Sequence, residues 1–396
     1  MNITILGSTG SIGVNTLDVV RRHGDRFSVF ALVAGRNVAV LLSQILEFRP
    51  AVVAVADETA LAILKNALGS STLSQSDWPE LTAGPAARVS AATAPEVEFV
   101  MSAIVGVAGL EATFQAITKK KRIGLANKEV LVASGRLVMD AVKRNGALMI
   151  PVDSEHNGAH QCLRAGLRNE VTRLILTASG GPFRETSKAD LWNVTPAQAL
   201  DHPTWKMGKR ITIDSATMMN KGFEVIEACW LFDLPATQVD VVVHPQSSIH
   251  AMVEYTDGSV IAQISATDMR MPIQYAMTYP DRDLAPVPRL DWTQPRNWAF
   301  GPPDFEKFRL LKLAYLSQER GGSATCTLNA ADEVAVEAFL QGRIPFPAIA
   351  EVVEETLTRQ PWREPATIEE VIAIDEESRE LASRIVDEPR PLVVAI

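Results

Sequence analysis

The sequence predicts an α/β protein with a Rossmann-like doubly wound sheet at its N-terminus, a central α/β catalytic domain with a mobile lid, and a helical C-terminal domain. First, short apolar runs of strand length alternate with amphipathic segments of helix length up to about residue 150. Second, a glycine-rich loop joins the first strand to the first helix. Third, four segments of helix length follow residue 305. We expect domains at residues 1–150, 151–280 and 305–396, with a linker rich in proline and aspartate at 281–304.

The composition excludes several classes of protein. The chain has 396 residues, of which 47% are hydrophobic and 21% charged, so it can bury a large core. Its net charge of −9 argues against nucleic acids or anionic membranes as partners. Cys162, Cys229 and Cys326 are far apart and lack metal-ligand spacing. Because the chain opens directly into strand residues and has no run long enough to span a bilayer, we expect a cytoplasmic protein.

The N-terminal half is predicted to alternate between strands and helices. We expect strands at Ile3–Leu6, Phe27–Val33, Ala51–Val55, Val97–Met101, Arg122–Leu125 and Ala147–Ile150, and helices at Val14–His23, Val38–Phe48, Glu58–Leu68, before Lys119, and at Val130–Arg144.

The first loop, residues 7–13, has the context of a dinucleotide-binding turn. Gly7 and Gly10 would permit a tight turn close to a pyrophosphate, and Gly13 would let the helix pack on the strand. The spacing is GxxGxxG, so a glycine-rich turn without a ligand is the alternative. After the second strand, Arg36 stands where a site selective for NAD would carry an acid, which favours the additional phosphate of NADP.

Two further strand ends carry polar residues. Asn127, Lys128 and Glu129 follow one strand, and a lysine in the first turn of a helix opposes the helix dipole unless it faces a phosphate or an oxyanion. Asp153 and Glu155 follow the strand at residues 147–150. They could simply begin a helix, but at this edge of a parallel sheet they are also suited to bind a hard cation.

The second half is predicted to carry the rest of the site. We expect a helix at Glu155–Leu167, a strand at Leu174–Thr177, a weak helix at Pro196–Leu200, a strand at Ile211–Asp214, a helix over Ser215–Glu227, strands at Val239–His244, Ile249–Tyr255 and Val260–Ile264, and helices at Glu306–Ser317, Leu328–Leu340, Ala348–Thr358 and Ile368–Ile385.

Loops between these elements indicate an anion site and a lid. The glycines of residues 178–183 could bind an anion through backbone N–H groups. Residues 202–208 carry Trp205 and Met207 beside proline and glycine, which favours a mobile lid, with a place in the core as the alternative. Glu224 and Glu227 share a face of an apolar helix, so they need a partner such as a metal shared with the carboxylates above.

Together these motifs resemble the 1-deoxy-D-xylulose 5-phosphate reductoisomerase family. The resemblance covers the whole chain and departs from the usual pattern only at Gly158, His160 and Asp332. The motifs that carry it are GSTGSIG at residues 7–13, ANKE at 126–129, PVDSEH at 151–156, ASGGPF at 178–183, HPTWKMG at 202–208, DSATMMNKG at 214–222 and LNAADEVAV from residue 328.

The resemblance implies a function. Such a protein isomerises 1-deoxy-D-xylulose 5-phosphate and reduces the product with NADPH to 2-C-methyl-D-erythritol 4-phosphate, the committed step of non-mevalonate (MEP) isoprenoid synthesis, as a homodimer. It implies a divalent cation (Mg²⁺, Mn²⁺ or Co²⁺) held by Asp153, Glu155 and Glu224, with Lys128 beside the reacting atoms. The substrate would contact Ser154, Glu155, Ser179, His202, Trp205, Met207, Ser215, Asn220, Lys221 and Glu224. The cofactor would contact Ser8, Thr9, Gly10, Ser11, Ile12, Gly35, Arg36, Asn37, Asn127, Lys128, Glu129 and Gly208.

Two other classes remain open from the sequence. One is a different NADP-dependent dehydrogenase, of a sugar or an aspartate-semialdehyde type. Most enzymes of the latter type rely on a cysteine nucleophile, and none of the three cysteines lies in a site motif. A catalytically silent cofactor-binding protein would not need Asp153, Glu155 and Glu224 together.

Overall fold

The computed structural model describes residues 1–205 and 207–388, and the chain divides into two compact units. The first unit holds residues 1–130, 138–157 and 268–289. The second holds residues 131–137, 158–267 and the chain from residue 290 onward. The four-part division expected from the sequence remains a prediction.

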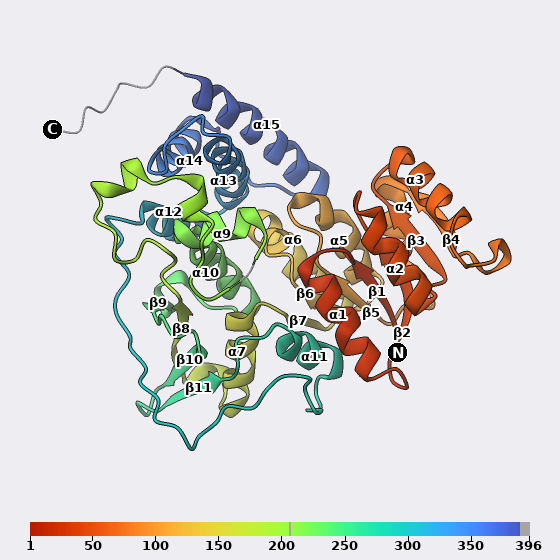
Figure 1. The fold of residues 1–396 in the computed structure, drawn as a ribbon. Helices are drawn as coiled ribbons and strands as arrows, with labels where there is room; N and C mark the ends of the chain where they lie inside the picture. Colours follow the sequence, from red (N-terminus) through yellow and green to blue (C-terminus); the bar gives the residue numbers. More distant parts are fainter. Residues whose placement is uncertain (206, 389–396) are drawn as a thin grey trace. The chain divides into compact units, whose positions relative to one another are not determined.

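The first unit is built on a parallel sheet of seven strands in the order β4-β3-β2-β1-β5-β6-β7 (Figure 1). The chain moves outward from β1 to β4 and then returns to the other side of β1 to form β5. This reversal makes the carboxyl ends of β1 and β5 the switch point where ligands bind in such sheets. The strands are β1 (Asn2–Leu6), β2 (Ser28–Val33), β3 (Val52–Val55), β4 (Glu80–Ala83), β5 (Phe99–Ser102), β6 (Arg122–Leu125) and β7 (Met149–Pro151).

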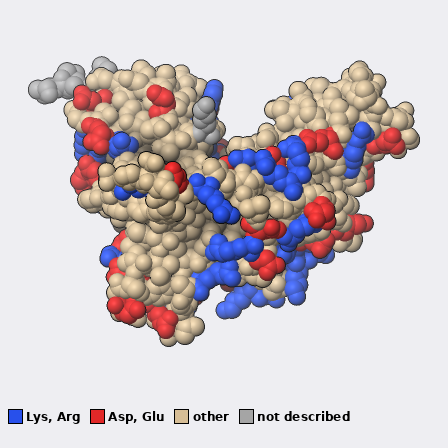
Figure 2. Space-filling view, turned by 60° about the horizontal axis from the view of Figure 1, so that its bottom comes forward, with Lys and Arg blue, Asp and Glu red and all other residues tan. Residues whose placement is uncertain are grey.

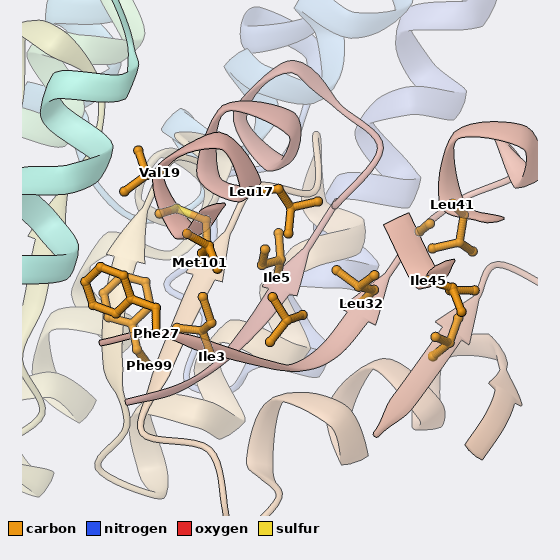
Figure 3. Close-up of a cluster of buried hydrophobic side chains, with 14 of the residues drawn as sticks. Ile3, Ile5, Leu17, Val19, Phe27, Leu32, Leu41, Ile45, Phe99 and Met101 are labelled. Carbon is orange, nitrogen blue, oxygen red and sulfur yellow. The ribbon is translucent and has the colours of Figure 1, made fainter. Parts of the chain in front are cut away.

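Helices cover this sheet and bury its branched side chains. Ile3 and Ile5 of β1 lie against Leu17 of the first helix, and Leu32 of β2 lies near Leu41 of the second (Figure 3). A helix from much later in the chain, α11, packs against the first. The helices are α1 (Ser11–Arg22), α2 (Val38–Phe48), α3 (Glu58–Gly69), α4 (Gly84–Thr93), α5 (Leu110–Thr118), α6 (Glu129–Asn145), α7 (Ser154–Cys162) and α11 (Arg270–Thr278). Residues 131–137 of α6 and the end of α7 belong to the second unit.

The second unit combines a mixed sheet with a group of helices. The sheet has the order β11-β10-β8-β9, and β8 pairs with β9 in parallel and with β10 in antiparallel fashion. Its strands are β8 (Val171–Ala178), β9 (Val239–Val243), β10 (Ile249–Tyr255) and β11 (Val260–Ile264). Its helices are α8 (Pro196–Ala199), α9 (Lys209–Ala216), α10 (Met219–Phe232), α12 (Arg309–Arg320), α13 (Ala324–Leu340), α14 (Ala348–Arg359) and α15 (Ile368–Asp387).

One predicted element is wrong. Residues 211–214, expected to form a strand, lie within helix α9. Their β-branched side chains favour a strand locally, but Gly208 begins a helix there, and the hydroxyl of Thr212 donates to the carbonyl of Gly208 at 2.8 Å. Ile213 and Ala216, three residues apart, are both fully buried against the helical core, so packing on one helix face overrides local propensity.

The described surface agrees with the charge balance of the sequence. On the face in Figure 2, acidic side chains lie among the Lys and Arg side chains. Among the described residues, no helix is long and apolar enough to cross a membrane.

Candidate active site

The loop between β1 and α1 is shaped by its glycines. Gly7 has φ +90°, and a Cβ there would lie 2.4 Å from the carbonyl oxygen of Ala103. A Cβ on Gly13 would lie 2.4 Å from the carbonyl oxygens of Gly7 and Ser8. Gly10 precedes α1, whose first turn has neither an acidic residue nor a side-chain cap. The N–H groups at this helix end are therefore available to an anion.

The end of β2 carries the expected arginine. Arg36 is 82% exposed, and its guanidinium donates to Oδ2 of Asp57 at 2.8 Å from Nη2. Asp57 follows β3 and caps α3, because its Oδ1 accepts from the N–H of Ala60 at 2.9 Å. This N–H and Arg36 lower the pKa of Asp57. Asn37 caps α2 through the N–H of Val40.

The ends of β6 and β7 bring a lysine to a carboxylate. Nζ of Lys128 lies 2.6 Å from Oδ2 of Asp153, and the Lys128 side chain is only 9% exposed. Asn127 is also buried, and its amide donates to the carbonyls of Ile104 and Gly106, which fixes the turn before α6. Glu129, the first residue of α6, is buried as well.

The turn after β7 holds the next two candidates. Ser154 begins α7, and its hydroxyl donates to Oε2 of Glu155 at 2.6 Å. The backbone of Asp153 accepts from the N–H of Asn157 at 2.8 Å. The side chain of Asn157 donates to the carbonyl of Pro151 at 2.8 Å, so one buried amide ties the helix to the strand end.

In the second unit, one histidine connects two serines. Nε2 of His202 lies 3.0 Å from Oγ of Ser179 and 3.1 Å from Oγ of Ser215. Nδ1 of His202 accepts from the backbone N–H groups of Thr204 and Trp205. The ring must therefore carry its proton on Nε2 when neutral, and burial lowers its pKa, which favours that neutral form. The cluster offers hydroxyl and N–H donors to one anion.

The glycines after β8 allow the backbone to approach Ser215 closely. Gly180 and Gly181 have φ of +82° and +65°, and a Cβ on Gly181 would lie 2.7 Å from the carbonyl oxygen of Ser215. The N–H of Gly181 donates to Oγ of Ser179. Trp205 and Met207 are half-buried and Gly208 is exposed, while Lys206 lies outside the described residues. Whether this segment moves remains a prediction.

Helix α10 carries a buried charged group. Oε1 of Glu224 accepts from the amide of Asn220 at 2.6 Å, and Oε2 pairs with the ammonium of Lys221. Glu224 and Lys221 are 1% and 3% exposed, so this pair lies out of water. Three expected ligands of substrate or metal thus meet on one helix turn.

The structure groups the predicted site residues by unit. The cofactor loop, Arg36, Lys128 and the Asp153–Glu155 turn belong to one edge of the first sheet, whereas the Ser179, His202 and Ser215 cluster and the Glu224 group belong to the second unit. Sequence reasoning missed Asp57 and Asn157. Asp57 could have been found by the rule used for Asp153, because it follows a strand of the same sheet; Asn157 gave no signal of its own.

Comparison with known proteins gives a consistent result along the chain. The sequence profile of 1-deoxy-D-xylulose 5-phosphate reductoisomerase matches residues 3–135. Two C-terminal domain profiles of the same enzyme match residues 149–232 and 264–381.

Whole proteins and solved structures agree. The chain is 66% identical to the 1-deoxy-D-xylulose 5-phosphate reductoisomerase of Solibacter usitatus, over 97% of this chain and 96% of that one. It is similar to the solved Zymomonas mobilis enzyme in complex with NADPH, with 45% identity, a TM-score of 0.90, and 98% and 99% of the two chains covered. A structure of DOX-P reductoisomerase with NADPH, fosmidomycin and magnesium also has a TM-score of 0.90, at 38% identity and 98% coverage of both chains.

Proposed function

The chain belongs to the 1-deoxy-D-xylulose 5-phosphate reductoisomerase family, and from this premise we propose how its own residues carry out the reaction. It is an NADPH-dependent oxidoreductase that uses a divalent cation to convert 1-deoxy-D-xylulose 5-phosphate into 2-C-methyl-D-erythritol 4-phosphate in the MEP pathway. The observation that supports the residue assignment best is a shared sheet edge. The glycine loop, Arg36 and the Lys128–Asp153 pair all lie at carboxyl ends of one parallel sheet.

The cofactor fits the first unit. The uncapped N-terminus of α1 suits a pyrophosphate, and the close backbone approach at Gly7 and Gly13 leaves no room for side chains. Arg36 would bind the 2′-phosphate of NADPH, exchanging its present partner Asp57 for a doubly charged group.

The donor set fits a hard divalent cation. Asp153, Glu155 and Glu224 offer carboxylate oxygens, and Lys128 and Lys221 already supply positive charge to Asp153 and Glu224. When bound, the cation would polarise the substrate's carbonyl and hydroxyl oxygens and hold them in place.

The other residues would bind and orient the substrate. His202 would donate a hydrogen bond from Nε2–H to the phosphate, and Ser179 and Ser215 would donate from their hydroxyl groups. Asn220 and Lys221 would contact the same phosphate. Lys128 would donate to the oxygen on which negative charge develops. Trp205 and Met207, on the proposed lid, would exclude water around the reacting carbon until hydride transfer is complete.

We also propose a cytoplasmic homodimer. All three cysteines are buried and free, which suits a reducing compartment. Strand β11 is an edge of its sheet and leaves Val260 48% and Ile261 38% exposed. An apolar edge of this kind is readily covered by a second copy.

A single assay tests the function. Purified protein with Mg²⁺ should oxidise NADPH when 1-deoxy-D-xylulose 5-phosphate is added, and should yield 2-C-methyl-D-erythritol 4-phosphate. Omitting either the metal or the ketose phosphate should stop NADPH oxidation. Metal-independent NADPH oxidation, or reduction of an unrelated aldehyde at the same rate, would contradict the proposal.

A further inference from the structure

Two carboxyl groups face each other inside the second unit. Asp332 of α13 is 0% exposed and Asp214 of α9 is 3% exposed. The two side chains are close enough to share a hydrogen bond. Two ionised carboxylates have only acceptors, so such a bond exists only if one of the pair carries a proton.

The neighbouring cation, Arg210, already donates hydrogen bonds to other side chains. Arg210 donates from Nη1 to Oε1 of Glu333 at 2.7 Å and from Nη2 to Oδ1 of Asn329 at 2.9 Å. Its Nη2 lies 3.8 Å from Oδ2 of Asp332, beyond hydrogen-bond distance. Within the described part of the chain, neither oxygen of Asp332 receives an ordinary hydrogen bond. An ionised Asp332 would therefore be buried without a donor, which is costly.

The cation nearest to Asp332 is shared among several carboxylates: Arg210 lies 3.8 Å from Asp332 and 3.7 Å from Asp214 but bonds to Glu333 at 2.7 Å. Asp214 and Arg210 face it from α9, and Glu333 lies beside it on α13. From α15, Arg379 pairs with Glu333 and with Asp375. Burial and then the negative charge of Asp214 raise the pKa of Asp332 well above its usual range.

We propose that Asp332 keeps a proton at neutral pH and donates it to Asp214, and that this pair positions the end of α9 that carries Ser215. Asp214 directly precedes Ser215, whose hydroxyl lies 3.1 Å from Nε2 of His202. Helix α9 has only eight residues, begins without a side-chain cap, and packs against α10 and α13. Its contacts with α13 therefore help to fix where Ser215 lies. Asp332 is a positioning residue, and this role rests on the proposed function of Ser215 in phosphate binding.

The test compares Asp332→Asn with Asp332→Leu. The amide has the shape of a protonated carboxyl and donates without titrating, so Asp332→Asn should keep the wild-type KM for 1-deoxy-D-xylulose 5-phosphate. Asp332→Leu removes the hydrogen bond that Asp332 would donate to Asp214 and should raise that KM several-fold, with a smaller change in kcat. Asp240→Asn removes an equal charge from an exposed ion pair and serves as the control.

Two measurements on the free protein detect the proton itself. Wild-type protein near neutral pH should show an infrared band of a protonated carboxyl that is missing in Asp332→Asn but present in Asp240→Asn. A group with a raised folded pKa loses its stabilising contribution as pH rises through the range between its unfolded and folded values. The Tm of Asp332→Asn should thus exceed that of wild type by more at about pH 8 than at about pH 5.

These measurements separate the possible failures. No difference in the carboxyl band, or equal pH slopes of Tm in wild type and Asp332→Asn, would contradict the proposal that Asp332 is protonated. An Asp332→Asn variant with a KM as high as that of Asp332→Leu would overturn the positioning role. The band and the Tm slope are measured without substrate. They therefore test whether Asp332 is protonated even if the proposed function is wrong.

Discussion

At the scale of single residues, the candidate ligands each have a counter-charge from the chain itself. Arg36 pairs with Asp57, Lys128 with Asp153, and the ammonium of Lys221 with Glu224. Binding of a phosphate or a cation is therefore an exchange of partners. The exposed Arg36 pair contributes little to stability by itself, whereas the buried pair on α10 would be costly to break without a replacement charge.

The first prediction concerns cofactor choice. Arg36→Ala should weaken NADPH binding by about 1.5–3 kcal/mol, because a charge-assisted bond to the 2′-phosphate is lost, and should leave NADH binding nearly unchanged. Dissociation constants for both cofactors measure the effect. Lys65→Ala, which removes an exposed cation from α3, is the control. An equal loss of affinity for NADPH and NADH would show that Arg36 does not bind the 2′-phosphate.

The second prediction concerns the metal ligands. Asp153→Asn and Glu224→Gln should each abolish nearly all turnover while NADPH still binds, and a chelator should have the same effect on wild-type protein. Steady-state rates and cofactor titration measure both. Glu319→Gln, at an exposed position on α12, should behave like wild type. Substantial activity in either ligand variant with chelator present would remove that residue from the metal site.

At the scale of elements, the turn at residues 202–205 depends on the protonation of His202, which holds it through two backbone N–H groups. Its Nδ1 accepts hydrogen bonds from two backbone N–H groups. Protonation of Nδ1 turns it into a donor, so both hydrogen bonds are lost. Burial lowers the pKa of His202, so the unfolded chain binds this proton first as pH falls. The contribution of His202 to stability is present above its ordinary pKa and is lost as pH falls through the folded value.

The third prediction follows from that sign. In the free protein, acidification should change the fluorescence of Trp205, because its backbone N–H loses its acceptor, and His202→Gln should remove the change. Trp205→Phe identifies the signal among the seven tryptophans. His160 is the control, because burial lowers its pKa to about 4, and His160→Gln should keep the change. An identical pH response in His202→Gln would contradict the assignment.

Elements with strong patterns were predictable, and those fixed by tertiary contacts were not. Helix α2 and strands β6, β10 and β11 have the bounds that the sequence predicts. Helix α9 does not, because burial of Ile213 overrides β-branched propensity. Strand β4 and helix α4 were missed: β4 has no fully buried residue, and α4 is a weakly patterned, alanine-rich segment.

The same distinction holds for the candidate site. Residues at strand ends, such as Lys128 and Asp153, follow from chain order, since parallel strands share one edge. The resemblance to a family supplied the roles of His202 and Ser179. The contacts within pairs, such as Arg36 with Asp57, arise between loops distant in sequence, and no local pattern encodes them.

At the scale of the whole molecule, the two sheets differ in how much apolar surface their edge strands expose. In the first unit, the edge strands β4 and β7 have no fully exposed apolar stretch, since β4 is half-buried after its first residue and β7 is mostly buried. In the second unit, β11 exposes its first three residues, Val260 to Ala262. An exposed, apolar, unpaired strand edge is a liability that a second copy of the chain would remove.

The fourth prediction tests this expected dimer. Ile261→Lys should shift the protein from dimer to monomer, because a charge replaces an apolar side chain whose full burial contributes about 1.5–3 kcal/mol, and a symmetric interface counts it twice. Sedimentation velocity over a range of concentrations measures the shift. Val105→Lys is the matched control, because Val105 is 71% exposed but lies in a loop. If both variants sediment as wild type does, β11 is not at the interface; if wild type is monomeric at all concentrations, the chain forms no dimer.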